Sequence, residues 1–322
     1  MHKIIFLSTK LCYNNFIMKF KFDRFLYALA PMACVTDFAF RKICADFGAD
    51  MTTTEMVSAK ALDRKSKKTE LLLYELDHKA IKCVQLFGHE ANVIERVCKS
   101  GLLDNFDIID FNCGCPAPKI VKNKDGSAMM ADLENSKKVI SALVQNTTKP
   151  VSVKFRLGIN GVENYVEFGK MCEECGASFL ILHARTREQM YSGKVDLLAY
   201  KKLKDAVSIP VIASGDIKDF ESVEIIKNMG LDGVMIGRAS MGNPMIFSDL
   251  KGTNKPYNLK NIATEHFDTL LNFNNNAKKI IPYFRKHLAW YVKEKSNAST
   301  LRQTLFKLES IKEIKDFIIN NL

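Results

Sequence analysis

The stretch Ile108-Ile109-Asp110-Phe111-Asn112-Cys113-Gly114-Cys115-Pro116-Ala117-Pro118 joins a short apolar run to a turn that carries Asn and Cys side chains. Proline stiffens the exit of such a turn, and loops set on a rigid scaffold are where reactive side chains are usually presented. The stretch therefore predicts a buried strand that holds a thiol at the mouth of a cavity.

Short apolar runs of the same kind recur along the chain, with helical stretches between them. The eight expected strands are Phe25 to Ala30, Asp50 to Thr54, Ala80 to Leu86, Asp107 to Phe111, Val151 to Arg156, Ser178 to His183, Pro210 to Ala213 and Gly233 to Ile236. Eight strand–helix units whose strands are apolar on both faces indicate an α/β fold with a parallel sheet closed into a (β/α)₈ barrel. An open, doubly wound sheet is the alternative, but the eight units show no obvious reversal.

The chain is expected to have four parts. Residues 1–18 form an N-terminal extension, either disordered or upstream of a start at Met18, and their apolar run is too short for a signal sequence or a membrane span. Residues 19–250 form the barrel, and 251–257 form a polar linker with Gly and Pro. Residues 258–322 show helical patterning only, which predicts a small helical domain after the barrel.

The charge balance favours an anionic partner. The chain has 47 Lys and Arg against 36 Asp and Glu, a net charge of +11. Residues 258–322 contain 11 Lys and Arg against 6 Asp and Glu, so +5 of this excess belongs to the helical domain. Within it, Arg285, Lys286 and His287 lie among aromatic residues at helical spacing, which fits an RNA-facing helix. A solvated basic face on an ordinary amphipathic helix is the alternative, and both can hold for opposite faces.

The nine cysteines are scattered through a long, Lys-rich chain, which favours reduced thiols in a cytoplasmic protein. Cys113 and Cys115 could in principle ligate zinc. Their one-residue gap differs from the usual finger spacing, and no second Cys or His pair stands at a suitable distance, so we expect no metal. A free thiol is mostly protonated near neutrality and so suits a proton donor.

Polar or reactive residues follow every expected strand. In a barrel of this kind, side chains at the carboxyl ends of the strands converge on one face, where chemistry occurs. The candidates, in strand order, are Pro31 with Met32, Glu55, Gln85, Asn112 with Cys115, Lys154 with Arg156, His183 with Arg185, Ser214-Gly215-Asp216, and Gly237-Arg238.

Two of these groups point to an anionic cofactor. The glycines and the cation after the seventh and eighth strands occupy the position where barrels bind phosphate, although each glycine alone could simply serve a tight turn. Lys154 lies in an apolar strand whose interior would not tolerate an unpaired ammonium, unless its end reaches solvent. An anionic ligand would supply the counter-charge.

From about Tyr27 to about Lys307 the chain resembles the tRNA-dihydrouridine synthases, and within them the bacterial B-type branch. The resemblance is carried by the Asn112–Pro116 turn together with Pro31-Met32-Ala33, Gln85, Lys154, His183-Ala184-Arg185-Thr186-Arg187 and Gly237-Arg238. It implies that flavin mononucleotide (FMN) is bound by Pro31, Met32, Ala33, Gln85, Asn112, Lys154, His183, Ser214, Gly215, Asp216, Gly237 and Arg238. The family usually has Asn in place of Ser214, Gly in place of Ala184 and often Met in place of Cys113.

The resemblance also implies the reaction. NADPH, or NADH, reduces the flavin, a hydride passes to C6 of a uridine in tRNA, and Cys115 protonates C5 to give 5,6-dihydrouridine. Arg156 and Arg185, with the basic residues Arg285, Lys286 and His287, are expected to contact the RNA. We expect a monomer without a membrane anchor. The target uridine and a role for ribosomal RNA as a second substrate are left open.

Two other functions fit part of the pattern. A flavin-dependent dehydrogenase of a free pyrimidine would use the same flavin site and a catalytic Cys, but it leaves the basic helical domain without a task. An RNA-binding protein on a degenerate barrel would not need Lys154, Cys115 and both phosphate loops intact.

Overall fold

The computed structural model describes residues 21–274 and 276–322. The expected extension at residues 1–18 lies outside this part. Eight parallel strands close into a barrel in the order β1-β10-β9-β8-β5-β4-β3-β2, which confirms the (β/α)₈ prediction. The strands are β1 (Leu26–Leu29), β2 (Met51–Ser58), β3 (Ile81–Phe87), β4 (Ile108–Cys113), β5 (Val151–Arg156), β8 (Phe179–His183), β9 (Val211–Ser214) and β10 (Gly233–Ile236).

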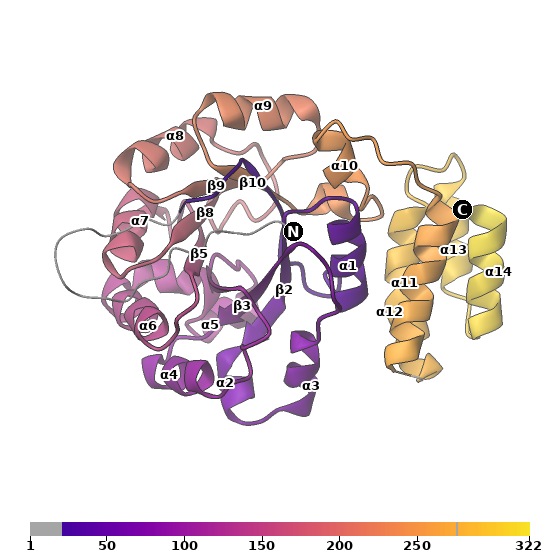
Figure 1. Ribbon diagram of the computed structural model, residues 1–322, viewed down its shortest axis with the longest axis horizontal. Helices are drawn as coiled ribbons and strands as arrows, with labels where there is room; N and C mark the ends of the chain where they lie inside the picture. The colour runs from indigo at the N-terminus through magenta and orange to yellow at the C-terminus, as the bar shows by residue number, and fades with distance from the viewer. Residues whose placement is uncertain (1–20, 275) are drawn as a thin grey trace.

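Helices surround the barrel (Figure 1). They are α1 (Phe38–Asp46), α2 (Ala59–Asp63), α3 (Lys67–Glu70), α4 (Ala91–Lys99), α5 (Pro118–Lys122), α6 (Leu133–Gln145), α7 (Tyr165–Glu174), α8 (Leu197–Ala206), α9 (Phe220–Asn228) and α10 (Ile246–Leu250), with 3₁₀ turns η1 (Leu71–Leu73), η2 (Gly126–Ala131) and η3 (Arg238–Ser240). A small hairpin, β6 (Gly158–Ile159) with β7 (Val162–Glu163), follows β5.

The side chains inside the barrel change from apolar to polar along the strands. Near the amino ends they are apolar and form one buried cluster that includes Cys83, Ile108, Ile181, Ile212 and Met235. Because side chains alternate between the two faces of a strand, residues two and four positions further along point to the same interior. The fold thus closes the lower barrel with a packed core and leaves polar groups at its carboxyl end.

The chain after the barrel is entirely helical in the described part. It contains α11 (Leu259–Phe273), α12 (Ala277–Tyr291), α13 (Ala298–Leu305) and α14 (Ile311–Asn321). These helices stand beside the barrel next to α1 (Figure 1), and α1 packs against α11. A second buried cluster joins Phe38 and Ile43 of α1 to Phe267, Phe284 and other side chains of the helices. No helix in the described residues is long and apolar enough to cross a membrane.

Candidate functional site

Polar side chains from neighbouring strands meet in the upper barrel. Gln85 pairs in register with Asp110, and Asn112 with Lys154. On the other side of β5 lies β8, which pairs with it in parallel and ends at His183. All five side chains belong to the interior face, because they continue the alternation begun by the apolar cluster below them. The structure therefore brings together the predicted residues of the third to sixth strands.

The Cys115 turn is held by side-chain and backbone bonds. The Asn112 amide oxygen accepts the N–H groups of Gly114 at 3.1 Å and Cys115 at 2.9 Å. The carbonyl of Cys115 accepts the Ser127 N–H at 3.1 Å. Gly126 has φ +62°, and a Cβ there would lie 2.8 Å from the Cys115 carbonyl, so only glycine lets this segment close on the turn. The thiol therefore sits on a fixed backbone.

The two cysteines of the motif have different surroundings. Cys113 is fully buried in the apolar cluster between barrel and helices, whereas Cys115 lies beyond the strand end and is partly exposed. Burial raises the pKa of Cys115, and the nearby Ala117 N–H, Arg156 and Lys154 offset this only in part. The thiol is therefore protonated at neutral pH, as a proton donor must be.

Buried charges lie beneath the turn. Burial and the like charge of Arg156 lower the pKa of Lys154 to about 8, while Asp110 acts in the opposite direction. Burial raises the pKa of Asp110 to about 6, against the hydrogen bonds from Ser152 and Gln85. Burial and four neighbouring cations lower the pKa of His183 far below its usual value, so its imidazole is neutral. The site thus holds more positive than negative charge and suits an anionic ligand.

The loops after β9 and β10 meet at a carboxylate. Asp216 pairs with Arg185 at 2.5 Å and with Arg238 at 2.8 Å. Gly215 has φ +115°, and a Cβ there would lie 2.9 Å from the His183 ring. Gly237 faces Met32 of the loop after β1. The predicted residues of the first, seventh and eighth strands therefore share one side of the mouth.

Two predicted RNA contacts are used differently in the structure. Arg156 is 2% exposed and donates to the carbonyls of Gly114, Thr186 and Met190. Arg185 is 1% exposed and donates to two carbonyls of residues 192–193 as well as to Asp216. These donors hold the loop between β8 and α8 and, for Arg156, the Cys115 turn as well, because a buried guanidinium needs several acceptors. That the two arginines contact RNA stays a prediction.

That loop carries an exposed aromatic ring that the sequence did not single out. Tyr191 is 55% exposed, and the guanidinium groups of Arg156 and Arg238 lie 5.5 Å and 5.6 Å from its ring centre. Arg238 also donates to the Tyr191 carbonyl at 3.3 Å. Cations on a ring of this kind keep it in place at the mouth. A single Tyr in a polar loop gave no signal by which to find it.

The basic residues Arg285, Lys286 and His287 of α12 differ in their exposure. Lys286 is exposed and lies close enough to Glu55 to lower its pKa, which burial raises. Arg285 is half-buried and donates to the Leu308 carbonyl of the same domain. His287 is 1% exposed and lies 3.1 Å from Asp37. Its contact with RNA stays a prediction, against which this burial argues. The helix turns this side chain toward the barrel.

Asp37 joins the barrel to the helical domain. Its carboxylate accepts the Phe40 N–H at 2.9 Å and the Tyr283 hydroxyl at 3.0 Å, and it lies 3.3 Å from His266 Nε2. Asp37, His266 and His287 have potential ligand atoms within 4.8 Å of one another, a spacing that could also hold a metal ion. Because the carboxylate already accepts protein donors, we interpret the cluster as a contact between domains. The sequence gave no signal for it, since its members are far apart in the chain.

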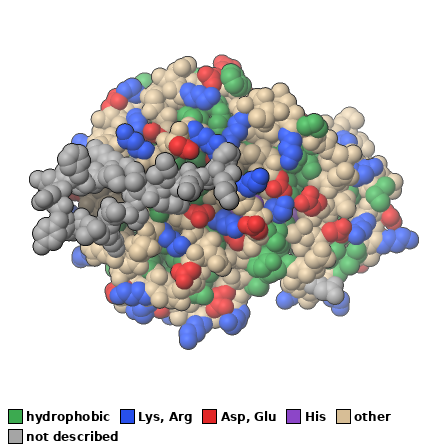
Figure 2. Space-filling view, viewed as in Figure 1, with side chains coloured by type: hydrophobic (Ala, Val, Ile, Leu, Met, Phe, Trp, Pro, Cys, Tyr) green, Lys and Arg blue, Asp and Glu red, His purple; other side chains and the backbone are tan. Residues whose placement is uncertain are grey.

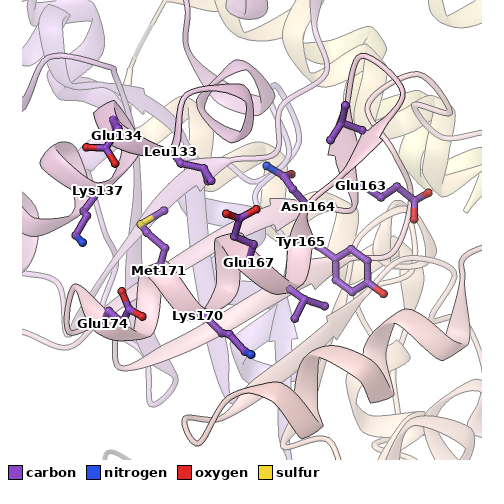
Figure 3. A pocket seen from close by; sticks show the side chains of 12 residues that line it. Leu133, Glu134, Lys137, Glu163, Asn164, Tyr165, Glu167, Lys170, Met171 and Glu174 are labelled. Carbon is purple, nitrogen blue, oxygen red and sulfur yellow. The ribbon is translucent and has the colours of Figure 1, made fainter.

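Two hollows lie outside the barrel interior. One, of about 730 Å³, lies between α6 and α7, and Figure 3 shows Glu134 and Lys137 on one side and Glu167 and Lys170 on the other. It contains no predicted site residue. The other, of about 260 Å³, lies where Glu55 and the β2–β3 connection face α11 and α12. The polar barrel mouth, and not the larger hollow, therefore remains the candidate site.

Comparisons with known proteins identify the family of the chain. A family model described as "Dihydrouridine synthase (Dus)" matches residues 28–321. A probable tRNA-dihydrouridine synthase of Rickettsia conorii is 36% identical over 288 residues, covering 85% of this chain and 86% of the relative. The tRNA-dihydrouridine synthase B of Vibrio vulnificus is 34% identical over 294 residues, covering 88% and 91%. The solved structure of an old yellow enzyme homologue from Zymomonas mobilis has a TM-score of 0.51 at 11% identity. The match covers 73% of this chain and 89% of that chain, and it shows a similar fold.

Proposed function

Because the chain belongs to the dihydrouridine synthase family, we propose that it reduces uridines of tRNA to 5,6-dihydrouridine with FMN as its cofactor and NADPH or NADH as electron donor. The observation that carries the proposal is the position of Cys115. Its protonated thiol stands on a fixed turn at the barrel mouth, close enough to the half-buried ammonium of Lys154 in the adjacent strand for that charge to influence its pKa. A proton donor and a cation on one face of a barrel suit reduction of an electron-poor double bond.

The residues of the mouth fit FMN. Lys154 makes no hydrogen bond among the described residues, and its neighbour Arg156 is also a cation, so an anionic ring would relieve both. Gln85, Asn112 and His183 would face the ring. The loops at 214–216 and 237–238 would hold the phosphate through backbone N–H groups and Arg238, and residues 31–33 would line the opposite side. The backbone can serve even though Ser214 replaces the usual Asn.

The chain's own groups have separate tasks in the reaction. Bound FMN supplies a hydride for C6 of the uracil. The Cys115 thiol gives its proton to C5 of the base, and the raised pKa keeps that proton in place until it is needed. Asn112 holds the turn and orients the ring it faces. The target base must leave its stack to reach the mouth, which requires the enzyme to hold the surrounding RNA.

The helical domain is the proposed RNA-binding part. Lys286 is exposed beside Glu55, and the second hollow also exposes Lys279 of the same helix near the mouth. On the face drawn in Figure 2, Lys and Arg side chains are spread among Asp and Glu over barrel and helices. We therefore expect several dispersed phosphate contacts, of which Lys286 is one. Ribosomal RNA would meet the same surface.

Dihydrouridine formation in unmodified tRNA tests the proposal. Wild-type protein, FMN and NADPH should produce dihydrouridine, and Cys115→Ala should slow its formation by about 10²- to 10⁴-fold, the usual contribution of general acid catalysis. Cys113→Ala is the matched control, since this thiol lies in the apolar cluster outside the barrel, and it should have a mild effect. No product with wild type on tRNA, but reduction of a free pyrimidine, would favour the alternative dehydrogenase.

A further inference from the structure

A buried carboxylate below the Cys115 turn has no task in the proposed reaction. Asp110 is fully buried in the barrel and accepts the Ser152 hydroxyl at 2.6 Å and the Gln85 side-chain N–H at 2.6 Å. It lies two residues before Asn112 on the same face of β4. A buried carboxylate costs free energy to desolvate, so its presence calls for a reason.

The carboxylate begins a chain of hydrogen bonds that ends at the reactive turn. Gln85 Nε2 donates to Asp110, and Gln85 Oε1 accepts from Asn112 Nδ2 at 2.8 Å. Asn112 Oδ1 then accepts the N–H groups of Gly114 and Cys115. Each of the side chains is buried, so water does not interrupt the chain.

The direction of this chain is fixed at both ends. An ionised carboxylate can only accept, and a backbone N–H can only donate. The two side-chain amides between them could each point either way, but reversing one would bring two donors together. Asp110 at one end and the backbone N–H groups at the other therefore favour the same orientation of the two amides, which is the orientation in the structure.

We propose that Asp110 is a positioning residue whose carboxylate sets, through the amides of Gln85 and Asn112, the orientation of the turn that carries the reactive thiol. The inference rests on the proposed role of Cys115 as proton donor. With a neutral amide at position 110 only the backbone N–H groups of Gly114 and Cys115 still fix the direction, so the arrangement is held from one end instead of two. The reversed arrangement, in which Asn112 turns its NH₂ group toward the backbone N–H groups, is then opposed at one end only. The turn keeps its bonds to Ser127 and Arg156 but is held less firmly by Asn112.

Moving the single negative charge from position 110 to position 85 distinguishes a positioning role of Asp110 from a simple contribution to stability. Asp110→Asn keeps the size of the side chain but removes the fixed direction. The double variant Gln85→Glu/Asp110→Asn moves the carboxylate by one place: Glu at 85 accepts from Asn at 110 and from Asn112, and Asn112 again offers its oxygen to the turn. The net charge equals that of the wild type. Asp107→Asn is the matched control, because this carboxylate lies at the opposite end of the same strand, where it accepts the Lys82 N–H.

The readout is the alkylation rate constant of Cys115 with iodoacetamide, resolved by peptide mass spectrometry, in protein saturated with FMN. Asp110→Asn should raise it by about two- to tenfold, the range that loss of one hydrogen bond allows. The double variant should return toward the wild-type rate, and Asp107→Asn should match wild type. Single-turnover dihydrouridine formation should fall about tenfold in Asp110→Asn, because misplacing a reacting group slows chemistry.

Several outcomes would overturn the inference. One is an Asp110→Asn protein whose Cys115 is alkylated at the wild-type rate. Another is a double variant whose alkylation rate equals that of Asp110→Asn. Should Asp110→Asn fail to fold, Gln85→Met breaks the chain without altering the carboxylate and should raise alkylation in the same way; an unchanged rate there also refutes the inference. A wild type that makes no dihydrouridine refutes the proposed function alone, since alkylation still reports the turn.

Discussion

Replacing Asp37 by Ala should loosen the helical domain from the barrel. The carboxylate is the N-cap of α1 through the Phe40 N–H, and it also accepts the Tyr283 hydroxyl and lies against His266 and His287 of the other domain. Burial, the largest influence, raises the pKa of Asp37, but the two histidines together hold it well below its usual value. The carboxylate is therefore ionised in the folded protein and has a partner in both domains.

The size of the effect follows from these contacts. Loss of an N-cap typically costs about 1 kcal/mol, and each buried donor left without a partner costs about 1–3 kcal/mol. With the Tyr283 hydroxyl and His266 both deprived of an acceptor, we expect Asp37→Ala to lower the free energy of unfolding by about 3–7 kcal/mol, the sum of the lost cap and of two donors left without a partner. Asp219→Ala is the matched control: it removes an exposed N-cap of α9 with no further partners and should cost about 1 kcal/mol.

Urea unfolding, monitored by tryptophan fluorescence, reports the loss of stability at the contact between the barrel and the helical domain. Trp290 is the only tryptophan, and its ring lies 5.2 Å from that of His287 beside the domain contact. Far-UV circular dichroism follows the barrel in the same samples. An Asp37→Ala transition no earlier than that of Asp219→Ala would refute the reasoning, because the histidine and tyrosine contacts would then contribute nothing.

The pH dependence has a definite sign. Because folding lowers the pKa of Asp37, its contribution is present above the carboxylate's ordinary pKa of about 4 and is lost as the pH falls toward the lower folded value. Burial, followed by the charge of His266, lowers the pKa of His287 to about 4, so the unfolded chain takes up this proton first as the pH falls below about 6.5. Wild type should therefore lose stability between pH 6.5 and 4. The difference between wild type and Asp37→Ala should persist to about pH 4 and shrink below it.

Three further predictions concern the site. Arg238→Ala should weaken FMN retention during gel filtration, because it removes the exposed cation of the phosphate loops; full retention would place the phosphate elsewhere. Lys154→Met should leave a folded barrel whose reduced flavin is harder to form, measured as a lower reduction potential, because the cation that stabilises the anionic hydroquinone is gone. Lys286→Ala should weaken tRNA affinity and reduce the slope of log affinity against log salt by about one contact, whereas Lys201→Ala, an exposed lysine of α8, should do neither.

The fold was largely predictable because its signal is local. Each buried strand is a short apolar run, and every expected run coincides with a barrel strand. The end of β2 was the weakest point: the strand continues from Thr54 to Ser58, through polar and half-buried residues, because a register shift against β3 carries it past the expected turn. No local pattern reveals such a shift, since it depends on the partner strand.

The candidate site was predictable only where strand ends determine it. Gln85, Asn112 and Lys154 follow from strand order, and the structure brings them together at the mouth. The tasks of the charged groups did not follow. Arg156 was expected to reach RNA, yet its donors hold backbone carbonyls of a loop. Whether an arginine faces solvent or a loop depends on how that loop folds back, and the sequence pattern carries no record of this.

The loop after β1 links the two halves of the proposed function. Residues 31–33 lie beside Gly237 and are proposed to line the flavin, and Asp37, four residues further on, holds the helical domain. Thr36 bonds to both the N–H and the carbonyl of Met32, so the segment between them is short and braced. A shift of the helical domain therefore pulls on the flavin loop. Asp37→Ala should consequently weaken FMN retention as well as domain docking, whereas Asp219→Ala should leave retention unchanged. Equal FMN retention in the two variants would show that the loop is held by the barrel alone.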